Sequence, residues 1–360
     1  MSIGTLMIRA DASSAMGTGH VMRCLALAQA WRSGGGDAVF VMAESTEAIE
    51  RRIQDEHFKG MTLSCASGSA EDARRILTLA DEYNATWIAV DGYQFSPTYQ
   101  RRIKHSDFQL LWIDDTGRCA PYCADIVLNQ NVYATTEMYR ESGARTTLLL
   151  GPRYALLRKE FLVWQHRQRH FAPVAARLLI TMGGSDPNNA TADILKTIGR
   201  AGLDVEVTIV LGGSNQNGAM LQRIAEHMPR QPRFATDVKD MSRLMSTADL
   251  AISAAGATSY ELALLQVPMV LVTLAENQAP TARGLAEHGA GVDLGTFQNL
   301  EPECLIEVLR RMIFDCEYRQ SVGHNARLLV DGNGARRVAQ AMLEQQQALA
   351  APWKVQVGSA

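Results

Sequence analysis

The feature that most constrains the fold is a regular alternation of two kinds of segment. Apolar runs of strand length, such as TLMIRAD at residues 5–11, alternate with helix-length amphipathic segments, such as EDARRILTLADEY at residues 71–83. Apolar strands separated by helices are typical of parallel sheets that carry helices on both faces. The alternation therefore predicts an α/β protein.

The same alternation starts again in the second half of the chain. In the first half we expect strands at residues 5–11, 38–44, 62–66, 87–93, 110–115 and 125–131. In the second half we expect them at residues 177–186, 205–214, 232–238, 248–256 and 268–274. Two sets of strands in one chain indicate two parallel sheets.

The length of the chain also favours two domains, because 360 residues exceed the usual size of a single core. We predict two Rossmann-like domains and two connecting or terminal segments. Their bounds are residues 1–155 for the first domain, 156–175 for a linker, 176–335 for the second domain, and 336–360 for a C-terminal helix and tail.

Composition narrows the class of function. The chain is 47% hydrophobic and 20% charged, with a net charge of -3, which fits a globular protein with no broad attraction to nucleic acid or to anionic membranes. Apolar stretches stay below the roughly 20 residues of a membrane span. Because the N-terminus enters a strand without a charged leader, we expect a cytoplasmic location.

The six cysteines are scattered, which fits reduced thiols better than a disulfide framework. Cys119 and Cys123 have a spacing that zinc can use, but no second pair of Cys or His with ligand spacing follows them. We therefore expect neither a metal site nor a cofactor.

Two loops of the second domain have the composition of phosphate-binding turns. The first, TMGGSDPNN, places glycines directly after a strand and before a helix start; the second, SAAGATSYELALL, repeats this arrangement and carries Glu261 in the first helical turn. Such turns offer backbone N–H groups to a diphosphate, and an acid one turn later accepts bonds from ribose hydroxyls. The two loops together favour a nucleotide over two plain βα turns. Neither contains the lysine motif of a P-loop.

In the first domain, GTGHVM places His20 at the start of a helix. Two glycines of a dinucleotide fingerprint are present and Glu44 ends the next strand, but Met22 stands at the third glycine position, so an NAD enzyme is only a weak alternative. A helix N-terminus disfavours the imidazolium form, which leaves a neutral imidazole available as a general base. The alternative is a packed or capping histidine.

Five segments in order carry a family resemblance: IRADASSAMGTGHVMRCLALA, GPRYALLRKEF, TMGGSDPNN, SAAGATSYELALL and ENQAPTARGL. From Leu6 to about Leu329 the chain resembles the UDP-2,4-diacetamido-2,4,6-trideoxy-beta-L-altropyranose hydrolases of pseudaminic acid biosynthesis, which are relatives of the GT-B glycosyltransferases. The resemblance implies two Rossmann-like domains in a GT-B arrangement with a cleft between them. It also implies a UDP-sugar substrate, UDP as product and a monomeric protein.

The resemblance assigns catalytic roles by position. His20 corresponds to the base that activates water, and Tyr93 to a tyrosine of the cleft. Asn277 corresponds to an asparagine that touches the sugar or the phosphate, with Gln278 beside it. Asp11 corresponds to an acid near the catalytic loop that orients His20 or contacts the substrate. A core tyrosine and an ordinary polar turn are the alternatives for Tyr93 and for the Asn277 turn.

The remaining positions would hold UDP. Glu261 would hold the ribose, and the backbone near Val238 would contact the uracil. Gly184 and Ser185 would approach the diphosphate, and Thr258 and Ser259 would bind it at the helix start. Gly17, Gly19 and Gly256 would also contact the substrate or UDP.

The expected chemistry is cleavage of the anomeric C–O bond by water, with inversion and without a metal. UDP is a good leaving group, so the reaction requires stabilisation of its charge more than it requires an acid. The alternatives are a GT-B glycosyltransferase with a hydroxyl acceptor, a UDP-sugar epimerase, and a protein that binds nucleotide sugars without turnover.

Overall fold

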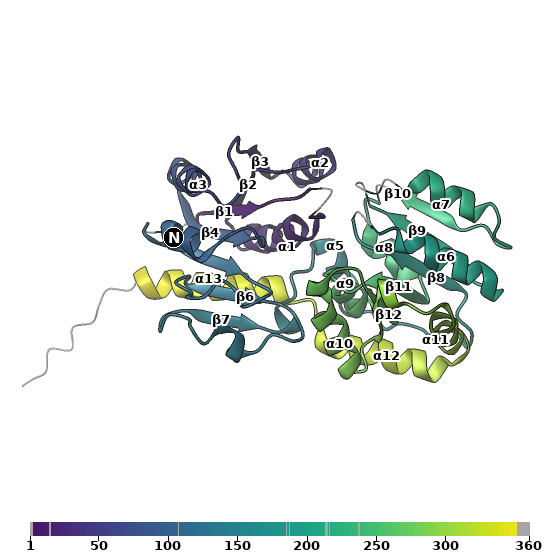
Figure 1. Ribbon diagram of the computed structural model, residues 1–360. Coiled ribbons are helices and arrows are strands. Elements are labelled where there is room, and N and C mark those ends of the chain that lie inside the picture. Colours follow the sequence, from purple (N-terminus) through teal and green to yellow (C-terminus); the bar gives the residue numbers. More distant parts are fainter. Residues whose placement is uncertain are drawn as a thin grey trace, which may run out of the picture.

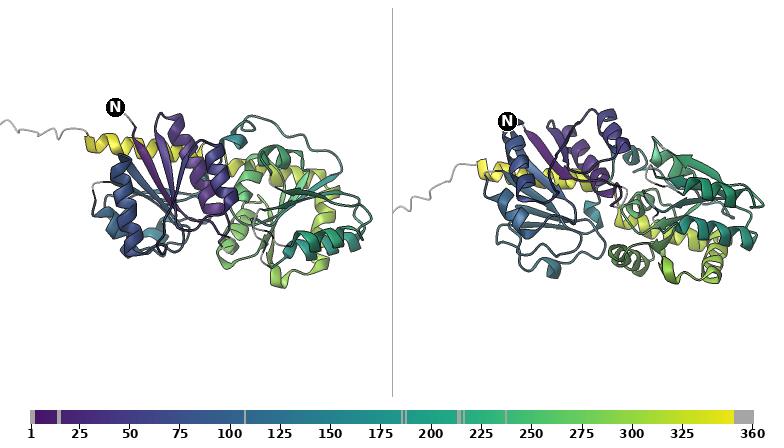
Figure 2. Two further views of the ribbon diagram at one scale, coloured as in Figure 1. Left: turned by 90° about the horizontal axis from the view of Figure 1, so that it is seen from above. Right: turned by 45° about the horizontal axis from the view of Figure 1, so that its top comes forward.

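The protein consists of two α/β domains that lie side by side (Figure 1). The computed structural model describes residues 3–13, 16–106, 108–184, 186, 188–212, 215, 217–236 and 238–350, with the backbone alone at 349 and 350. In each domain a parallel sheet carries helices on both faces (Figures 1 and 2). The predicted α/β class and the two Rossmann-like domains are therefore confirmed.

The first domain contains a parallel sheet with the strand order β3-β2-β1-β4-β5-β6-β7 among the described residues. Its strands are β1 (Thr5–Ala10), β2 (Asp37–Met42), β3 (Lys59–Thr62), β4 (Ala85–Asp91), β5 (Gln109–Ile113), β6 (Ile126–Asn129) and β7 (Thr147–Leu150). The strand order reverses between β1 and β4. These two strands pair from Leu6 with Trp87 to Ala10 with Asp91.

The second domain repeats this topology, with the order β10-β9-β8-β11-β12-β13 in its described part. Its strands are β8 (Arg177–Thr181), β9 (Glu206–Leu211), β10 (Arg233–Thr236), β11 (Leu250–Ala254), β12 (Met269–Thr273) and β13 (Val292–Thr296). The strand order reverses between β8 and β11. In open parallel sheets, ligands bind beyond the carboxyl ends of the strands at such a reversal.

The helices connect the strands and cover the two sheets. In the first domain they are α1 (Gly19–Ser33), α2 (Glu47–Asp55), α3 (Ala70–Glu82), α4 (Pro97–Lys104) and η1 (Thr136–Tyr139), followed by η2 (Pro152–Tyr154) and α5 (Lys159–Leu162) in the connection. In the second domain they are α6 (Ala190–Ala201), α7 (Gly218–Ala225), α8 (Met241–Thr247), α9 (Thr258–Leu264), η3 (Glu276–Gln278), α10 (Ala279–Glu287), η4 (Phe297–Asn299), α11 (Pro302–Phe314) and α12 (Cys316–Leu329). The last helix is α13 (Gly334–Ala350).

Three strands differ from the sequence expectation. The expected strand at 62–66 lies instead at β3, and β7 and β13 were not anticipated. β3 is an edge strand with the sequence KGMT and exposed residues, and β13 is only partly buried, so neither shows the apolar run that marks a central strand. β7 has only four residues, too few to establish an alternation.

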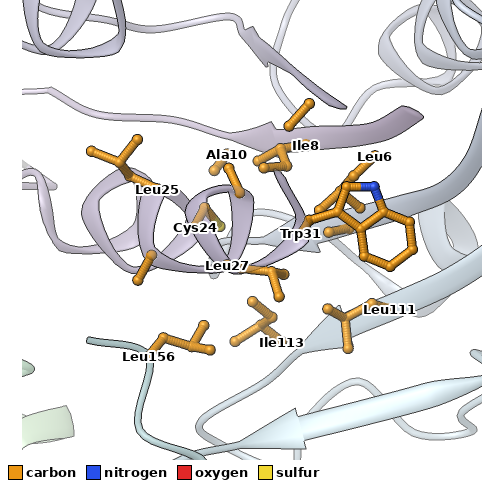
Figure 3. Close-up of a cluster of buried hydrophobic side chains, with 14 of the residues drawn as sticks. Leu6, Ile8, Ala10, Cys24, Leu25, Leu27, Trp31, Leu111, Ile113 and Leu156 are labelled. Carbon is orange, nitrogen blue, oxygen red and sulfur yellow. The ribbon is translucent and has the colours of Figure 1, made fainter. Parts of the chain in front are cut away.

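Helix α1 is buried on nearly all sides. Figure 3 shows Leu25, Leu27 and Trp31 of α1 in one cluster with Leu6 and Ile8 of β1 and with side chains of β5. On another side α1 packs against α13, whose Val338 and Met342 belong to the same cluster. The first turn of α1 lies at the carboxyl end of the central strand β4, where His20 bonds to Asp91.

The chain passes between the domains twice, and the two passages touch. After α12 the chain returns, and α13 lies along the first domain (Figures 1 and 2). At Gly334 a side chain would collide with the backbone of Ala155 on the outgoing passage. The predicted limit at residue 335 falls inside α13, so α13 begins with the last residues assigned to the second domain and packs on the first domain.

Candidate active site between the domains

The sequence-predicted residues gather at the two points where strand order reverses. In the first domain, the loop after β1 leads to His20, and β4 is followed by Tyr93. In the second domain, the loop after β8 contains Gly184 and the loop after β11 contains Gly256. A side chain added at Gly184 would lie 3.5 Å from the Thr18 hydroxyl oxygen, so the two glycine turns meet across the domain boundary.

His20 lies in the first turn of α1 and is 8% exposed. Its Nδ1 is 2.7 Å from Oδ1 of Asp91, the last residue of β4. Because a carboxylate only accepts hydrogen bonds, Nδ1 carries the hydrogen and the lone pair of the neutral ring is on Nε2. The ring of Tyr93 stands edge-on to the imidazole at 4.9 Å between centroids. This arrangement fixes both the tautomer and the orientation of His20.

Asp91 is fully buried and is shared between His20 and Arg23. Arg23 donates from Nε and from Nη2 to the two carboxylate oxygens, each at 2.6 Å. Burial favours the protonated acid, but the charge of Arg23 and the bonds from Arg23 and His20 outweigh it and hold the pKa of Asp91 well below its usual value. Asp91 is therefore a charged, fixed partner for His20.

Asp115, two residues after β5, connects this pair to side chains from further along the chain. It accepts two bonds from Arg23 Nη1, at 3.0 and 2.9 Å, and a bond from the Tyr93 hydroxyl at 3.2 Å. Asn131 donates to it at 2.7 Å and in turn accepts from the Tyr260 hydroxyl of the second domain at 3.2 Å. The network thus runs from His20 to the domain interface.

The roles of Asp91, Arg23 and Asp115 were not predicted from the sequence. Two signals were available: Asp91 and Asp115 each end an apolar strand, and Arg23 follows His20 by one helical turn. Their pairing was not visible in the sequence, because Asp91 lies 71 residues from His20 and Asp115 lies 92 residues from Arg23.

Tyr93 and Asn277 meet across the domain boundary. Asn277 Nδ2 donates to the Tyr93 hydroxyl at 3.0 Å, although Tyr93 as a whole is 52% exposed. Burial of the hydroxyl and the charge of Asp115 raise the pKa of Tyr93 above its usual range, so the group is a neutral phenol. Gln278 instead accepts a bond from the Leu274 N–H at 2.9 Å and closes its own turn.

Asp11 does not orient His20. It is fully buried and accepts from Arg9 at 2.6 Å, from the Ala43 N–H at 2.7 Å, from Gln94 at 2.8 Å and from the Ser67 hydroxyl. No hydrogen bond among the described residues joins it to His20. The expectation that Asp11 orients His20 was wrong because Asp11 follows β1 toward β2, while the neighbouring strand β4 brings Asp91 to the ring.

The glycine turns differ in how open they are. Gly17 has a φ of +80° that favours glycine, and a side chain at Gly17, Gly19 or Gly256 would meet open space. Gly184 packs against Gly212 of the next strand end, where a side chain on Gly212 would collide with the Gly184 backbone. The neighbouring predicted residue, Ser185, lies outside the described residues.

The start of α6 is not free for an anion. Asp186 is buried, and its carboxylate accepts from the Ala190 N–H at 2.8 Å and from the Thr191 N–H at 3.0 Å. This carboxylate takes the place that the sequence suggested for a diphosphate at the helix start. Of the described residues of this loop, Gly184 approaches Thr18 of the first domain.

In the second turn, Thr258 begins α9 and is partly exposed, whereas Ser259 is fully buried. The Ser259 hydroxyl lies 3.5 Å from the Ala254 carbonyl oxygen, and its N–H bonds to the Gly256 carbonyl at 3.0 Å. The expected contact between Ser259 and a diphosphate is therefore wrong for its side chain in this conformation. Gly256, Ala257 and Thr258 are the partly exposed members of the turn.

Glu261 is 13% exposed and pairs through Oε1 with Arg158 of the linker at 3.0 Å. Burial raises the pKa of Glu261 although Arg158 opposes the shift. No described residue donates a hydrogen bond to Oε2. Val238, two residues after β10, is partly buried.

Two kinds of feature are absent from the described residues. Among the described residues, no three side chains of His, Cys, Asp or Glu lie together as they do around a metal ion. Within the same residues, no helix has both the length and the apolarity that a membrane span needs.

The second domain is similar to a known family. Residues 178–342, from β8 into α13, match the Glycosyltransferase family 28 C-terminal domain. Together with the two Rossmann-like domains, this match shows that the chain has the GT-B fold.

Several known proteins are similar to this chain in sequence. Uncharacterized protein MJ1062 of Methanocaldococcus jannaschii is 26% identical over 73% of this chain, which spans about half (54%) of that protein's length. Spore coat polysaccharide biosynthesis protein SpsG of Bacillus subtilis is 25% identical over 92% of this chain and 95% of its own. The UDP-2,4-diacetamido-2,4,6-trideoxy-beta-L-altropyranose hydrolase of Campylobacter jejuni is 26% identical over 80% of this chain and 98% of its own.

Solved structures share the fold at low identity. MurG of Acinetobacter baumannii superposes with a TM-score of 0.64 at 17% identity, covering 95% of this chain and 99% of MurG. The spinosyn rhamnosyltransferase SpnG, in complex with thymidine diphosphate, gives 0.66 at 16% identity over 96% of this chain and all of SpnG. S. aureus MnaA, solved with UDP, gives 0.66 at 10% identity over 97% and 98%.

Proposed function

We propose that the protein is an inverting hydrolase of a UDP-linked diacetamido-trideoxy sugar. The substrate is UDP-2,4-diacetamido-2,4,6-trideoxy-beta-L-altropyranose, and the products are the free sugar and UDP. The observation that carries this proposal is the His20–Asp91 pair, a histidine with one fixed tautomer at the domain boundary. The similarity to the Campylobacter hydrolase over nearly all of that protein's length supports the same substrate class.

His20 would act as the general base. Its Nε2 takes a proton from water while the water oxygen forms a bond to the anomeric carbon. The bond between that carbon and the UDP oxygen breaks, and its electron pair leaves with UDP. Attack opposite the leaving group inverts the anomeric configuration. Asp91 holds the ring and stabilises the imidazolium that forms, as a buried carboxylate does in other acid–base pairs.

The second domain would hold UDP. The backbone at Gly183 and Gly184 and the turn from Gly256 to Thr258 would receive the diphosphate. The free oxygen of Glu261 would accept from ribose, and the backbone of Val238 would contact uracil. Asn277 and Tyr93, joined at 3.0 Å, would close the sugar pocket between the domains.

A second candidate is a glycosyltransferase in which His20 deprotonates a hydroxyl acceptor. The match of the second domain to the Glycosyltransferase family 28 C-terminal domain favours this alternative. The two candidates use the same base and the same UDP site, and they differ only in the acceptor.

The test is UDP release from the purified protein and the UDP-diacetamido-trideoxy sugar, with EDTA present and no acceptor added. NMR follows the anomeric configuration of the first-formed product. Acceptor-free release with inversion supports the hydrolase. Release that requires an added hydroxyl acceptor replaces the hydrolase with the transferase. Interconversion of UDP-sugars without net release of UDP indicates an epimerase, and UDP binding without turnover indicates a binding protein.

A further inference from the structure

Arg23 stands between two buried carboxylates beside the proposed base. It donates two bonds to Asp91, each at 2.6 Å, and two to Asp115, at 3.0 and 2.9 Å. Its Nη2 also lies 3.3 Å from Nδ1 of His20. Since Nδ1 carries a hydrogen toward Asp91, this last distance is a contact between two donors and not a hydrogen bond.

The charges of this cluster depend on the state of His20. With a neutral imidazole, Asp91, Arg23 and Asp115 sum to one negative charge; with an imidazolium the cluster is neutral. The two carboxylates therefore favour protonation of His20, and Arg23 opposes it. Since all three side chains are buried, water screens these interactions only weakly.

Charged or titratable groups face His20 from each element packed against it. From α1 these are Arg23 and the positive end of the helix, which also favours the neutral ring. β4 contributes Asp91, and the loop after it contributes the neutral Tyr93, whose hydroxyl bonds to Asp115. The second domain contributes the uncharged Asn277 through Tyr93.

We propose that Arg23 and Asp115 are positioning residues that set the protonation of His20. Arg23 compensates Asp91 so that Asp91 can hold the ring without keeping it protonated, and Asp115 fixes Arg23 in place. This inference deepens the proposed function and rests on it for its role in turnover.

The charge balance predicts shifts of opposite sign. In Arg23→Gln the acid limb of the pH–rate profile moves to higher pH, by about one to two units, because Asp91 and Asp115 are no longer compensated. In Asp115→Asn the limb moves to lower pH by a smaller amount, because one negative charge is removed. The double variant Arg23→Gln/Asp115→Asn has the original net charge, so its limb returns toward that of the unchanged protein.

A role of these residues in folding alone would not produce this pattern. Loss of structure lowers the rate of every variant without moving the limb in opposite directions. Arg51→Gln on α2 is the matched control, because Arg51 is 63% exposed and pairs only with Glu47 among the described residues. Its profile should match the unchanged protein. Arg23→Lys keeps the charge and should keep the limb while lowering the rate.

NMR of the imidazole nitrogens measures the same balance without substrate. The signal of His20, one of eight histidines, is assigned by its absence in His20→Asn. Its titration midpoint should rise in Arg23→Gln, fall in Asp115→Asn and return in the double variant. If Arg23→Gln fails to fold, Asp115→Asn and the double variant still test the sign.

The two proposals fail in different ways. Midpoints that move as expected in a protein that releases no UDP would support the charge balance and overturn the hydrolase. Midpoints that stay in place, or move in the same direction in Arg23→Gln and Asp115→Asn, would overturn the inference even in an active enzyme.

Discussion

The two domains have a similar order of strands, but they carry different groups at the point where that order reverses. In the first domain the strand ends carry Asp11, Asp91 and Asp115, all buried and each paired with an arginine. In the second domain the strand ends lead into glycine turns at Gly183–Gly184 and Gly256, whose accessible surface is mainly backbone. The difference suggests that the first domain fixes charges for chemistry while the second leaves backbone for a ligand.

The substitution His20→Asn tests this division of roles between the domains most directly. If the first domain supplies the base, the turnover rate should fall by about 10²- to 10⁴-fold while UDP affinity changes less than about twofold. Steady-state kinetics and calorimetric titration with UDP measure the two effects. His105→Asn, at the exposed end of α4, is the control and should leave both unchanged. Full activity in His20→Asn would exclude His20 as the base.

The second prediction concerns stability at the two strand ends. Asp91→Asn should lower the free energy of unfolding by about 3 to 5 kcal/mol, because it removes one of the two carboxylates that pair with buried Arg23. Ser253→Ala, near the end of β11, removes one hydroxyl bond of 3.0 Å and should cost about 1 kcal/mol. Chemical denaturation measures both. Equal losses of unfolding free energy would show that the strand ends of the two domains do not differ in their contribution to stability.

Low pH should remove the stabilisation that the Asp91 carboxylate provides. Its pKa is depressed in the folded protein, so its contribution is present above the unfolded pKa of about 4 and is lost as the pH falls further. The difference in stability between the unchanged protein and Asp91→Asn should therefore shrink below about pH 4. A difference that stays constant to pH 2 would contradict the assigned charge state.

The third prediction acts on the second domain. Glu261→Gln should weaken UDP binding by about tenfold, because an amide accepts more weakly from ribose hydroxyls than a carboxylate does. The rate at saturating substrate should hardly change. Asp193→Asn on the exposed face of α6 is the matched control. A loss of rate with unchanged UDP affinity would place Glu261 in the chemistry instead.

The sequence predicts the parts of this comparison that depend on local pattern. Apolar runs mark the central strands, and residues that follow a strand directly, such as Tyr93, are placed at the cleft by strand direction alone. Asp91 and Asp115 pair with residues 68 to 92 positions away, and only the strand order brings them together. The wrong prediction that Asp11 orients His20 has the same cause. Asp11 is the acid closest to His20 in sequence, but it contacts the chain after β2, whereas His20 bonds to Asp91 of β4.

The smallest expected effect is at the contact between the domains. Asn277→Ala removes the bond to the Tyr93 hydroxyl, and its net value of about 1 kcal/mol corresponds to a roughly fivefold loss in kcat/KM. Tyr93 keeps its bond to Asp115, so the His20 site itself should remain in place. Asn299→Ala is the control, because Asn299, like Asn277, is exposed and lies in a short 3-10 helix of the second domain. If Asn277→Ala instead abolished turnover with the UDP affinity unchanged, the second domain would contribute to the chemistry itself, and the division between a catalytic and a binding domain would fail.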